Sequence, residues 1–600
     1  MNELARELTL DESEPLEPPS QSEVQSLPLP ARAEPASTPF ADLDQLLHAM
    51  EGRATSGLSL DSLWLALVDW GIHLANSPFR SVELALSAAE QWRRLLQAAL
   101  GKQVIRPAPN DHRFQSDAWD KPPFSVICQA FLLAEEWWAQ VSDGGRDVNR
   151  HNAQIVRFAV RQFLDVFSPS NVPWLNPQVI EATRESGGAD FVEGFRNWLH
   201  DLQETLSGAP SDRRGFSVGR NLAVTPGKVV FRNELMELIQ YAPSTAVVRP
   251  EPVLIVPAWI MKYYILDLSP HNSLIRYLVE QGHTVFAISW RNPGREMRET
   301  SLDDYRVKGV LAALDAIRAI CGEAKVHACG YCLGGTLLAI AAAALARDGD
   351  ERLATVTLLA AQTDFHEAGE LQLFIGERQL AFLEDVMSVQ GYLDSRQMTG
   401  AFQLLRSNDL IWSRLVNSYL LGRPEMANDL MAWNADGTRM PARMHSEYLR
   451  QLFLDNDLAE GKFQVSGRPV SISDIRVPLF AVGTETDHVA PWRSVYKIHL
   501  LNEGDITFVL TAGGHNAGIV SEPGHPHRSF RIRHHPAEER YLGPDEWAAL
   551  AEEREGSWWP EWVRWLGEHS GRVTKPPPMG QTSTGYQVLG DAPGEYVMDH

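Results

Sequence analysis

The segment Val326–Gly335 constrains the fold of this chain most, because it joins a strand, a sharp turn and the start of a helix around one cysteine, Cys332. A strand-to-helix elbow strains the backbone of its apex residue and crowds its neighbours, and Gly330, Gly334 and Gly335 supply the small residues that this requires. The following helix, Leu333–Arg347, directs the aligned peptide dipoles of its N-terminus at the sulfur, which favours the attacking thiolate. The segment therefore predicts a nucleophilic cysteine.

Two other interpretations of the same segment stand beside this one. A buried cysteine is most often a small core residue, and Cys329 with Cys332 also spells C-x-x-C, which is typical of thiol redox proteins. A redox pair needs no flanking glycines, whereas the elbow needs small residues on both sides of its apex. We therefore expect Cys332 to be the nucleophile and Cys329 to end the strand, buried and inert.

Composition bounds the remaining function classes. The chain has 600 residues, a formal net charge of -23 and four cysteines. The charge argues against nucleic-acid binding, and the cysteines do not form a disulfide framework, so we expect a reducing compartment. Residues 1–7 do not begin a secretory signal, and the most apolar stretch, Leu337–Ala346, is too short to span a bilayer. We expect a cytoplasmic protein without an integral membrane segment, a metal or a cofactor.

The chain divides by pattern into three regions. Residues 1–39 are rich in Glu, Pro and Ser, which predicts a disordered tail. Residues 40–235 carry apolar residues at helical spacing, and Ser77-Pro78 is typical of a helix start, so we expect a helical N-terminal domain. Residues 236–600 form the third region, in which strands and helices alternate after Val253.

That alternation predicts an α/β fold with a mostly parallel sheet and crossover helices. A mainly helical insertion at about 362–474 interrupts it, and a nucleophile elbow in such a sheet indicates an α/β-hydrolase core with a cap over its active site. The expected strands are Val253–Val256, Thr284–Trp290, Val326–Cys329, Ala354–Leu359, Pro478–Val482 and Ile506–Leu510, and the expected helices are Ser273–Gln281, Leu302–Ile320, Leu333–Arg347 and Trp492–Leu501.

In an α/β-hydrolase an acid and then a histidine follow the nucleophile, each on a loop after a strand. Asp487 follows the strand Pro478–Val482, and His515 follows Ile506–Leu510 on a glycine-rich loop. His515 would accept the Cys332 proton, and Asp487 would orient the imidazole. Glu485 and His488 are the neighbouring rivals, and neither matches the usual position of acid or base.

An oxyanion hole in this fold combines two backbone N–H groups. One would come from Leu333, directly after the nucleophile. The other would come from the loop Val256–Lys262, where Trp259 and Ile260 are the candidates and the sequence does not choose between them.

Many segments outside the elbow resemble one family, the polyhydroxyalkanoate synthases, which polymerise 3-hydroxyacyl-coenzyme A (CoA) into storage polyester. The resemblance runs in order from about Asp111 to the C-terminus. The segments that carry it are Asp111–Phe114 with Trp119, Ser168–Asn171, Gly219–Ala223 with Thr225–Gly227, Leu254–Pro257, Lys262–Leu268, Ile288–Pro293, Gly330–Thr336, Asp487–Trp492, Gly514–Gly518 and Gly556–Pro560.

The resemblance implies a single-subunit-type synthase in which Cys332 is acylated, His515 is the general base and Asp487 is the acid. In the family, the counterpart of Asp487 is also discussed as the group that activates the 3-hydroxyl. The substrate would be (R)-3-hydroxyacyl-CoA, with CoA as part of the substrate and no cofactor. The resemblance further implies a homodimer paired through the cap, a growing polyester chain, and location at cytoplasmic polymer granules.

Two segments depart from the family pattern, and two other functions remain open. Met261 stands where the family commonly has asparagine, and residues 528–542 differ from the commonest form, which leaves acyl-length preference and catalytic rate open. An acyl-CoA thioesterase or esterase of the same fold would use the same triad. An inactive granule-associated protein would need none of it.

Overall fold

The computed structural model describes residues 39–55, 57–108, 111–145, 148–207, 215–398, 400, 407–423 and 427–600. The tail expected at 1–39 lies outside these residues except for its last member. The chain divides into two compact units, Met1–Asp44 and Gln45–His600, and the second holds the sheet, the cap and the candidate site. Among the described residues, none of the helices combines the length and apolar character needed to cross a membrane.

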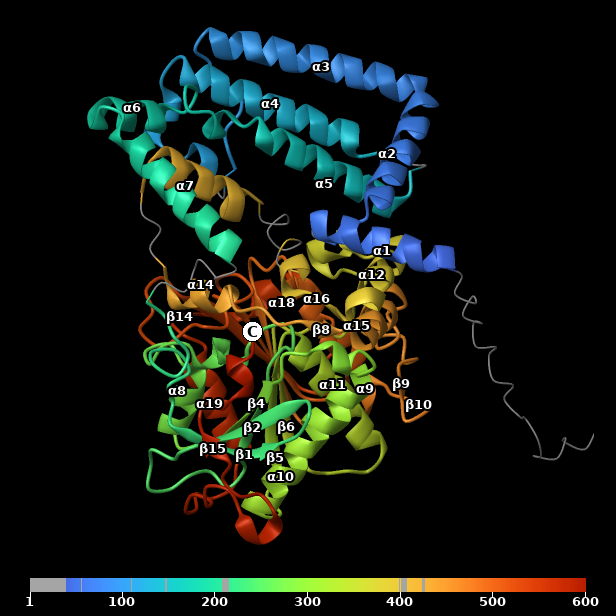
Figure 1. Ribbon diagram of the computed structural model, residues 1–600, viewed down its shortest axis with the longest axis vertical. Coiled ribbons are helices and arrows are strands. Elements are labelled where there is room, and N and C mark those ends of the chain that lie inside the picture. The colour runs from blue at the N-terminus through green and yellow to red at the C-terminus, as the bar shows by residue number, and fades with distance from the viewer. Residues whose placement is uncertain are drawn as a thin grey trace, which may run out of the picture. The chain divides into compact units, whose positions relative to one another are not determined.

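Seven helices make up the described part of the N-terminal region (Figure 1). Ser59 and Asn149 cap two of them by accepting hydrogen bonds from backbone N–H groups of the first turn, and Ser77 occupies an N-cap position before Pro78 without a side-chain cap bond. The helices are α1 (Pro39–Ala54), α2 (Leu60–Ala75), α3 (Pro78–Ala99), α4 (Phe124–Ser142), α5 (Arg150–Val166), α6 (Pro177–Ser186) and α7 (Ala189–Ser207).

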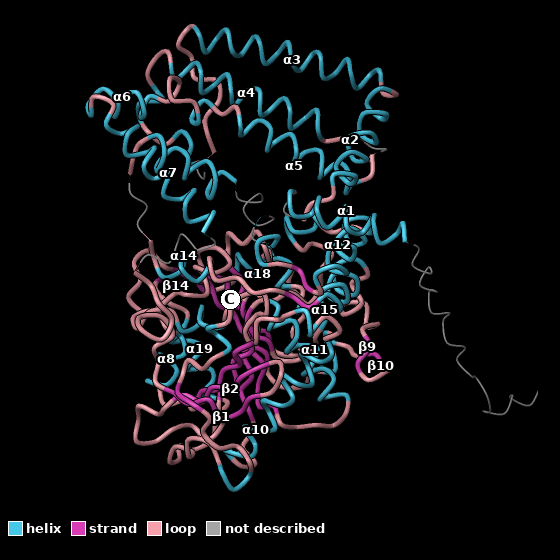
Figure 2. Tube along the Cα trace, viewed as in Figure 1, coloured by secondary structure: helices cyan, strands magenta, loops and turns pink. Residues whose placement is uncertain are grey.

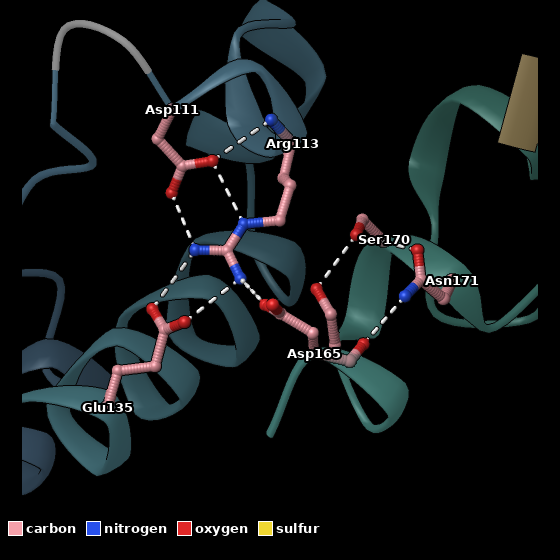
Figure 3. Close-up of polar contacts among 7 residues, drawn as sticks. Asp111, Arg113, Glu135, Asp165, Ser170 and Asn171 are labelled. Atoms are coloured by element: carbon pink, nitrogen blue, oxygen red, sulfur yellow. Dashed lines mark hydrogen bonds and ion pairs between the residues drawn. The ribbon is translucent and has the colours of Figure 1, made fainter. Parts of the chain in front are cut away.

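A half-buried arginine ties this helical region together. The Arg113 guanidinium donates to the carboxylates of Asp111, Glu135 and Asp165 at 2.9, 2.9 and 3.0 Å (Figure 3). Asn171 in turn donates to the Asp165 carbonyl at 2.7 Å. Burial lowers the pKa of Arg113, but the hydrogen bonds and charges of the surrounding carboxylates outweigh burial and raise it. For Glu135 the effect of burial is the larger one, and it raises the pKa of that carboxyl group. Two of the family-like segments, at 111–114 and 168–171, thus meet in one ionic network.

The rest of the chain is built on a mixed sheet with the strand order β14-β13-β12-β11-β6-β5-β3-β4-β2-β1-β15. The central strands, from β12 to β4, are parallel, and antiparallel strands complete both edges. The strands are β1 (Gly227–Arg232), β2 (Met236–Tyr241), β3 (Val253–Val256), β4 (Val285–Trp290), β5 (Val326–Tyr331), β6 (Leu353–Leu359), β11 (Leu479–Thr484), β12 (Ile506–Thr511), β13 (Ser529–His535), β14 (Glu552–Glu555) and β15 (Gly590–Asp591).

All six strands expected from the sequence are present, and they are the buried parallel ones. Figure 2 shows the strands as one twisted group with helices packed against it. The helices around the sheet are α8 (Leu274–Glu280), α9 (Leu302–Asp304), α10 (Ala312–Cys321), α11 (Leu333–Arg347), α16 (Trp492–Tyr496), α17 (Ile498–Leu501), α18 (Pro544–Leu550) and α19 (Trp559–Glu568). The α/β fold with a mostly parallel core and a helical N-terminal region is confirmed.

The helix expected at Leu302–Ile320 differs from the prediction in its middle. Between α9 and α10 the backbone forms a π-helical segment, Tyr305–Leu311. A Cβ on Gly309 would lie 2.4 Å from the Trp290 indole, so this segment packs directly against the end of β4. Sequence periodicity does not distinguish this wider turn from an α-helix.

A largely helical insertion separates β6 from β11. Only small strands interrupt it, and its core side chains, such as Leu380, Met444 and Leu452, are fully buried. The insertion contains a 3-10 helix η8 (Gly369–Phe374), α12 (Glu377–Gln390), β7 (Tyr392–Leu393), the π-helical segments η9 (Asn408–Trp412) and η10 (Leu415–Leu420), α14 (Asp429–Asn434), β8 (Met440–Pro441), α15 (Ala442–Tyr448), the π-helical η11 (Leu449–Leu454), β9 (Gln464–Val465) and β10 (Arg468–Pro469).

Candidate active site

Cys332 occupies the turn between β5 and α11 in a strained conformation, with φ 53° and ψ -125°. Its N–H donates to the Leu359 carbonyl on the neighbouring strand at 2.9 Å, and its own carbonyl accepts from the N–H of Gly335 at 2.9 Å. A positive φ costs a residue with a side chain of order 1–3 kcal/mol, so the surrounding contacts must hold it. The result is a thiol fixed at the N-terminus of α11.

The glycines of the elbow are required by close approach. A Cβ on Gly334 would lie 2.2 Å from the Val256 carbonyl oxygen, and one on Gly335 would lie 2.4 Å from the Ala361 side chain. Gly334 thereby lets α11 pass directly beside the loop that follows β3. The sequence pattern around Cys332 thus reflects backbone packing as well as chain conformation.

Asp487 and His515 come together on the loops after β11 and β12. Asp487 Oδ2 accepts from His515 Nδ1 at 2.8 Å and from the Thr484 hydroxyl at 2.7 Å. Asp487 Oδ1 accepts from the N–H groups of Val489 and Ala490, both at 2.8 Å. Burial favours the protonated carboxyl, but the imidazole and these donors outweigh it and lower the pKa of Asp487. The carboxylate is therefore held in one position by four donors.

The surroundings of His515 favour its charged form. Burial alone would lower its pKa, but the charges of Asp487 and Cys332 raise the pKa well above its usual value. The Tyr331 ring lies beside the imidazole, with centroids 5.6 Å apart, and the Tyr331 hydroxyl donates to Asn516 at 2.6 Å. The neighbouring Asp487 and Cys332 therefore favour the protonated imidazole.

The rival residues of the sequence analysis lie elsewhere. Glu485 and His488 are exposed, while Asp487 between them has a side chain with no exposed surface. The structure thus brings Asp487, not its neighbours, to the histidine. Cys329 is 1% exposed within β5, burial raises the pKa of its thiol, and both it and Cys332 are free cysteines. This geometry does not favour a redox pair.

A mainly apolar cavity of about 100 Å³ lies over the thiol. Ile260 and Leu333 line it beside Cys332, whereas Trp259 packs its ring against Tyr305 at 5.5 Å and does not reach the cavity. Of the two candidates from the loop after β3, Ile260 is the one that lines the cavity. The cap supplies most of the remaining wall, from η8, α12, β7, α15 and η11.

The sequence analysis missed the polar residues of this cavity. Gln397 and His445 line it, and within the described part of the chain Gln397 Nε2 and His445 Nδ1 are buried without a hydrogen-bond partner. Burial lowers the pKa of His445 to about 3, so its imidazole is neutral. Both residues come from the cap, where no motif marks them. The described residues contain no cluster of side chains suited to a metal ion.

Comparison with known proteins identifies the family. A family model for the N-terminus of poly-beta-hydroxybutyrate polymerase (PhaC) matches residues 110–278, a second one for the N-terminal part of that polymerase matches 38–80, and one for the alpha/beta hydrolase fold matches 251–522. A poly(3-hydroxyalkanoate) polymerase from Methylorubrum extorquens is 41% identical over 524 residues, which is 86% of either chain. The chain belongs to the poly(3-hydroxyalkanoate) polymerase family.

Another relative carries the same name. The subunit named PhaC of poly(3-hydroxyalkanoate) polymerase from Rhizobium meliloti is 38% identical, covering 87% of this chain and 86% of that one. Among solved structures, a monoacylglycerol lipase from Paleococcus ferrophilus aligns over 56% of this chain and 99% of its own, with 14% identity and a TM-score of 0.31.

Met261, which departs from the family pattern, has a structural setting of its own. It pairs with Gly437 of the cap through an isolated antiparallel bridge, and the Trp259 carbonyl accepts from the Thr438 hydroxyl at 2.6 Å. The loop after β3 is thus held by the cap on one side and by the elbow on the other. The divergent segment 528–542 forms β13 and its following loop, and the Tyr496 hydroxyl donates to the Leu542 carbonyl at 2.9 Å.

Proposed function

We propose that this chain polymerises (R)-3-hydroxyacyl-CoA into polyhydroxyalkanoate with release of CoA, through an acyl thioester on Cys332. The observation that carries the proposal is the strained Cys332 of the elbow, opening into an apolar cavity beside the His515–Asp487 pair. The similarity to relatives named poly(3-hydroxyalkanoate) polymerase supports the substrate class.

Acylation starts from a thiolate on Cys332 and an imidazolium on His515, a pairing that the raised pKa of His515 favours. The thiolate attacks the thioester carbonyl, and the N–H groups of Leu333 and Ile260 would hold the oxyanion. The carbon–sulfur bond to CoA then breaks, and His515 gives its proton to the departing CoA sulfur. One thioester replaces another, so the step is close to balanced in energy.

In chain growth His515 must accept a proton rather than donate one, and acylation of Cys332 makes this easier. Once Cys332 is acylated its negative charge is gone, which removes one cause of the raised pKa of His515. The neutral imidazole can then accept the proton of a 3-hydroxyl group, whose oxygen attacks the acyl thioester. An ester bond forms, the carbon–sulfur bond breaks, and the thiolate–imidazolium pair is restored.

Asp487 would act through His515 in both steps. Its two oxygens already accept four hydrogen bonds, and its side chain has no exposed surface, so it does not face the cavity. We therefore assign it to holding the imidazole rather than to binding the 3-hydroxyl. Gln397 and His445 also line the cavity, and each has one buried polar atom, Nε2 and Nδ1, without a hydrogen-bond partner among the described residues.

We also propose that the protein works as a homodimer at the surface of cytoplasmic polymer granules. The support is the exposed apolar surface of the N-terminal helices, where Trp64, Phe79 and Trp92 are 68%, 85% and 67% exposed. Exposed apolar surface of this extent fits contact with an apolar phase or another subunit. Sedimentation of the purified chain with and without 3-hydroxybutyryl-CoA would measure both associations; a monomer that stays in solution would contradict them.

The deciding experiment supplies purified protein with 3-hydroxybutyryl-CoA or with butyryl-CoA, which lacks the hydroxyl. We expect CoA release and chloroform-soluble polyester from the first substrate, and one equivalent of CoA with a stable acyl-enzyme from the second, because a closed apolar site admits little water. Free acid from both substrates without oligomer would indicate a thioesterase. No CoA release from either would indicate an inactive granule-associated protein.

A further inference from the structure

A short segment outside the hydrolase fold reaches the candidate active site. Gly57 and Leu58 line the same cavity as Cys332, although they precede the first strand of the sheet by most of the N-terminal region. Within the described part of the chain, the other residues of the cavity wall come from the hydrolase core or its cap. The segment Gly57–Ser59 is therefore an addition to the acyl site that the core fold does not provide.

One cap residue fixes this segment on both sides of Leu58. The Gln379 side-chain oxygen accepts from the Ser59 N–H at 2.9 Å, and its nitrogen donates to the Gly57 carbonyl at 2.5 Å. Gln379 lies on α12, is 7% exposed and itself lines the cavity. A buried amide costs free energy unless both its donor and its acceptor are satisfied, and here the backbone around Leu58 satisfies them.

The flanking helices hold the segment in the same place. Ser59 caps α2, so the chain direction after Leu58 is set by the helix start. Before it, helix α1 packs on α12: His48 Nδ1 lies 2.8 Å from Asp385 Oδ2, and a Cβ on Gly52 would lie 2.8 Å from the Val386 side chain. Leu58 is thus positioned by two helices and one glutamine, and its half-buried side chain has little freedom to move away.

We propose that Leu58 is a specificity-determining residue of the acyl site, where it limits the length of the acyl side chain that Cys332 accepts, with Gln379 as the residue that positions it. The inference rests on the proposed acyl transfer at Cys332. A rigid apolar wall discriminates between acyl groups by roughly 10- to 200-fold per methylene, because an extra carbon must displace the wall. Leu58→Ala removes three carbon atoms from that wall.

The first test compares two substrates within each full-length variant. We expect Leu58→Ala to raise the ratio of kcat/KM for 3-hydroxyhexanoyl-CoA over 3-hydroxybutyryl-CoA about tenfold, and Gln379→Ala to raise it by a smaller factor. Leu60→Ala and Arg378→Ala are matched controls, since both residues are exposed neighbours outside the cavity. Because the ratio is taken within one preparation, partial unfolding lowers both rates and leaves the ratio unchanged.

The second test does not depend on catalysis. The rate of Cys332 alkylation by a bulky maleimide is divided by its rate with iodoacetamide, and the modified peptide is identified by mass spectrometry. Leu58→Ala should raise this quotient, and Leu60→Ala should not. If wild-type protein turns over both substrates but the Leu58 and Gln379 variants keep its chain-length ratio, the inference is wrong. If wild-type protein releases no CoA, the proposed function fails, and the alkylation quotient decides the inference alone.

Discussion

At the scale of single residues, Cys329 and Cys332 show how position decides the chemistry of one side-chain type. Cys329 lies inside β5, and burial raises the pKa of its thiol, which keeps it protonated and inert. Cys332 lies three residues further, at the strained turn, where the cavity reaches it. The strand and the turn, rather than the C-x-x-C spacing, separate their roles.

Replacing each cysteine tests this separation. We expect Cys332→Ala to lower CoA release at least about a thousandfold, because no nucleophile remains at the cavity. Cys329→Ala should keep most activity and cost about 1 kcal/mol of stability from the lost sulfur contacts. CoA release and the thermal midpoint would be measured for both variants. Similar losses of activity in two folded variants would contradict the nucleophile assignment and favour a redox pair.

Asp487→Asn tests how the acid acts. The negative charge of Asp487 is the largest contribution that raises the pKa of His515 against the effect of burial. Without it the pKa of His515 should fall, and NMR titration of the imidazole would report the change. Thiolate formation weakens, but deprotonation of a weakly acidic hydroxyl suffers more because it needs a fully oriented base. We expect single-turnover acylation to persist while polymer growth slows by a larger factor. An unchanged His515 titration would contradict the assigned role.

The sequence predicted some of these residues and missed others for a physical reason. Cys332, Asp487 and His515 each follow a buried parallel strand, and the fixed order of such loops along the chain makes them recognisable. The Gln379 side chain bonds to the backbone of Gly57 and Ser59, on either side of Leu58, across more than three hundred residues, and these two hydrogen bonds leave no local pattern. The sequence does not show that Ile260, rather than Trp259, lines the cavity, because that depends on how the loop packs.

At the scale of elements, close packing between the elbow and the loop after β3 depends on Gly334. Gly334→Ala would place a Cβ 2.2 Å from the Val256 carbonyl oxygen, and neither backbone can yield without moving the sheet or α11. We expect a loss of several kcal/mol of stability, in the range of severe overpacking, together with loss of CoA release. The thermal midpoint and CoA release would be compared with wild type.

A matched control is available on an N-terminal helix. A Cβ on Gly71 of α2 would meet nothing within 4 Å, and its φ is not positive. Gly71→Ala should therefore raise helix stability by up to about 1 kcal/mol through the lower backbone entropy of alanine. A Gly334→Ala variant that is as stable and active as Gly71→Ala would show that the elbow can relax.

Several of the strands that sequence analysis missed lie at or near the two edges of the main sheet. β13 (Ser529–His535) and β14 (Glu552–Glu555) carry many charged residues and pair antiparallel outside β12, while β1 and β2 close the other edge. β13 and β14 are mostly exposed or half-buried and need no continuous apolar run, so their pattern resembles that of loops. β1 begins at Gly227, before the boundary at 235 that we expected between helical and catalytic regions.

At the scale of the whole molecule, buried neutral histidines link stability to pH. Burial lowers the pKa of His283 and His499 to about 4 and of His327 and His445 to about 3. His327 Nδ1 lies 2.8 Å from the Thr355 hydroxyl oxygen and its Nε2 lies 3.0 Å from that of Ser570, so it is paired in the neutral form. All four histidines belong to the unit that contains the sheet and the cap.

The direction of the effect follows from which state binds more protons. Below the ordinary histidine pKa of about 6.5, these histidines bind protons in the unfolded chain but not in the folded chain. The free energy of unfolding therefore falls as the pH decreases. The loss continues until the folded-state values near pH 3 to 4 are reached. Each histidine contributes about 1.4 kcal/mol per pH unit within that window.

His327→Gln isolates one of these contributions, because an amide can keep a hydrogen bond but cannot take up a proton in this range. The free energy of unfolding, measured by urea titration between pH 7 and pH 5, should fall less steeply with decreasing pH for the variant than for wild type. The difference in slope should correspond to about one proton taken up on unfolding, even if the variant is less stable at pH 7. His271→Gln is the control, since His271 is exposed. A variant with the slope of wild type would show that His327 titrates normally in the folded state and that the acid sensitivity of the fold has another source.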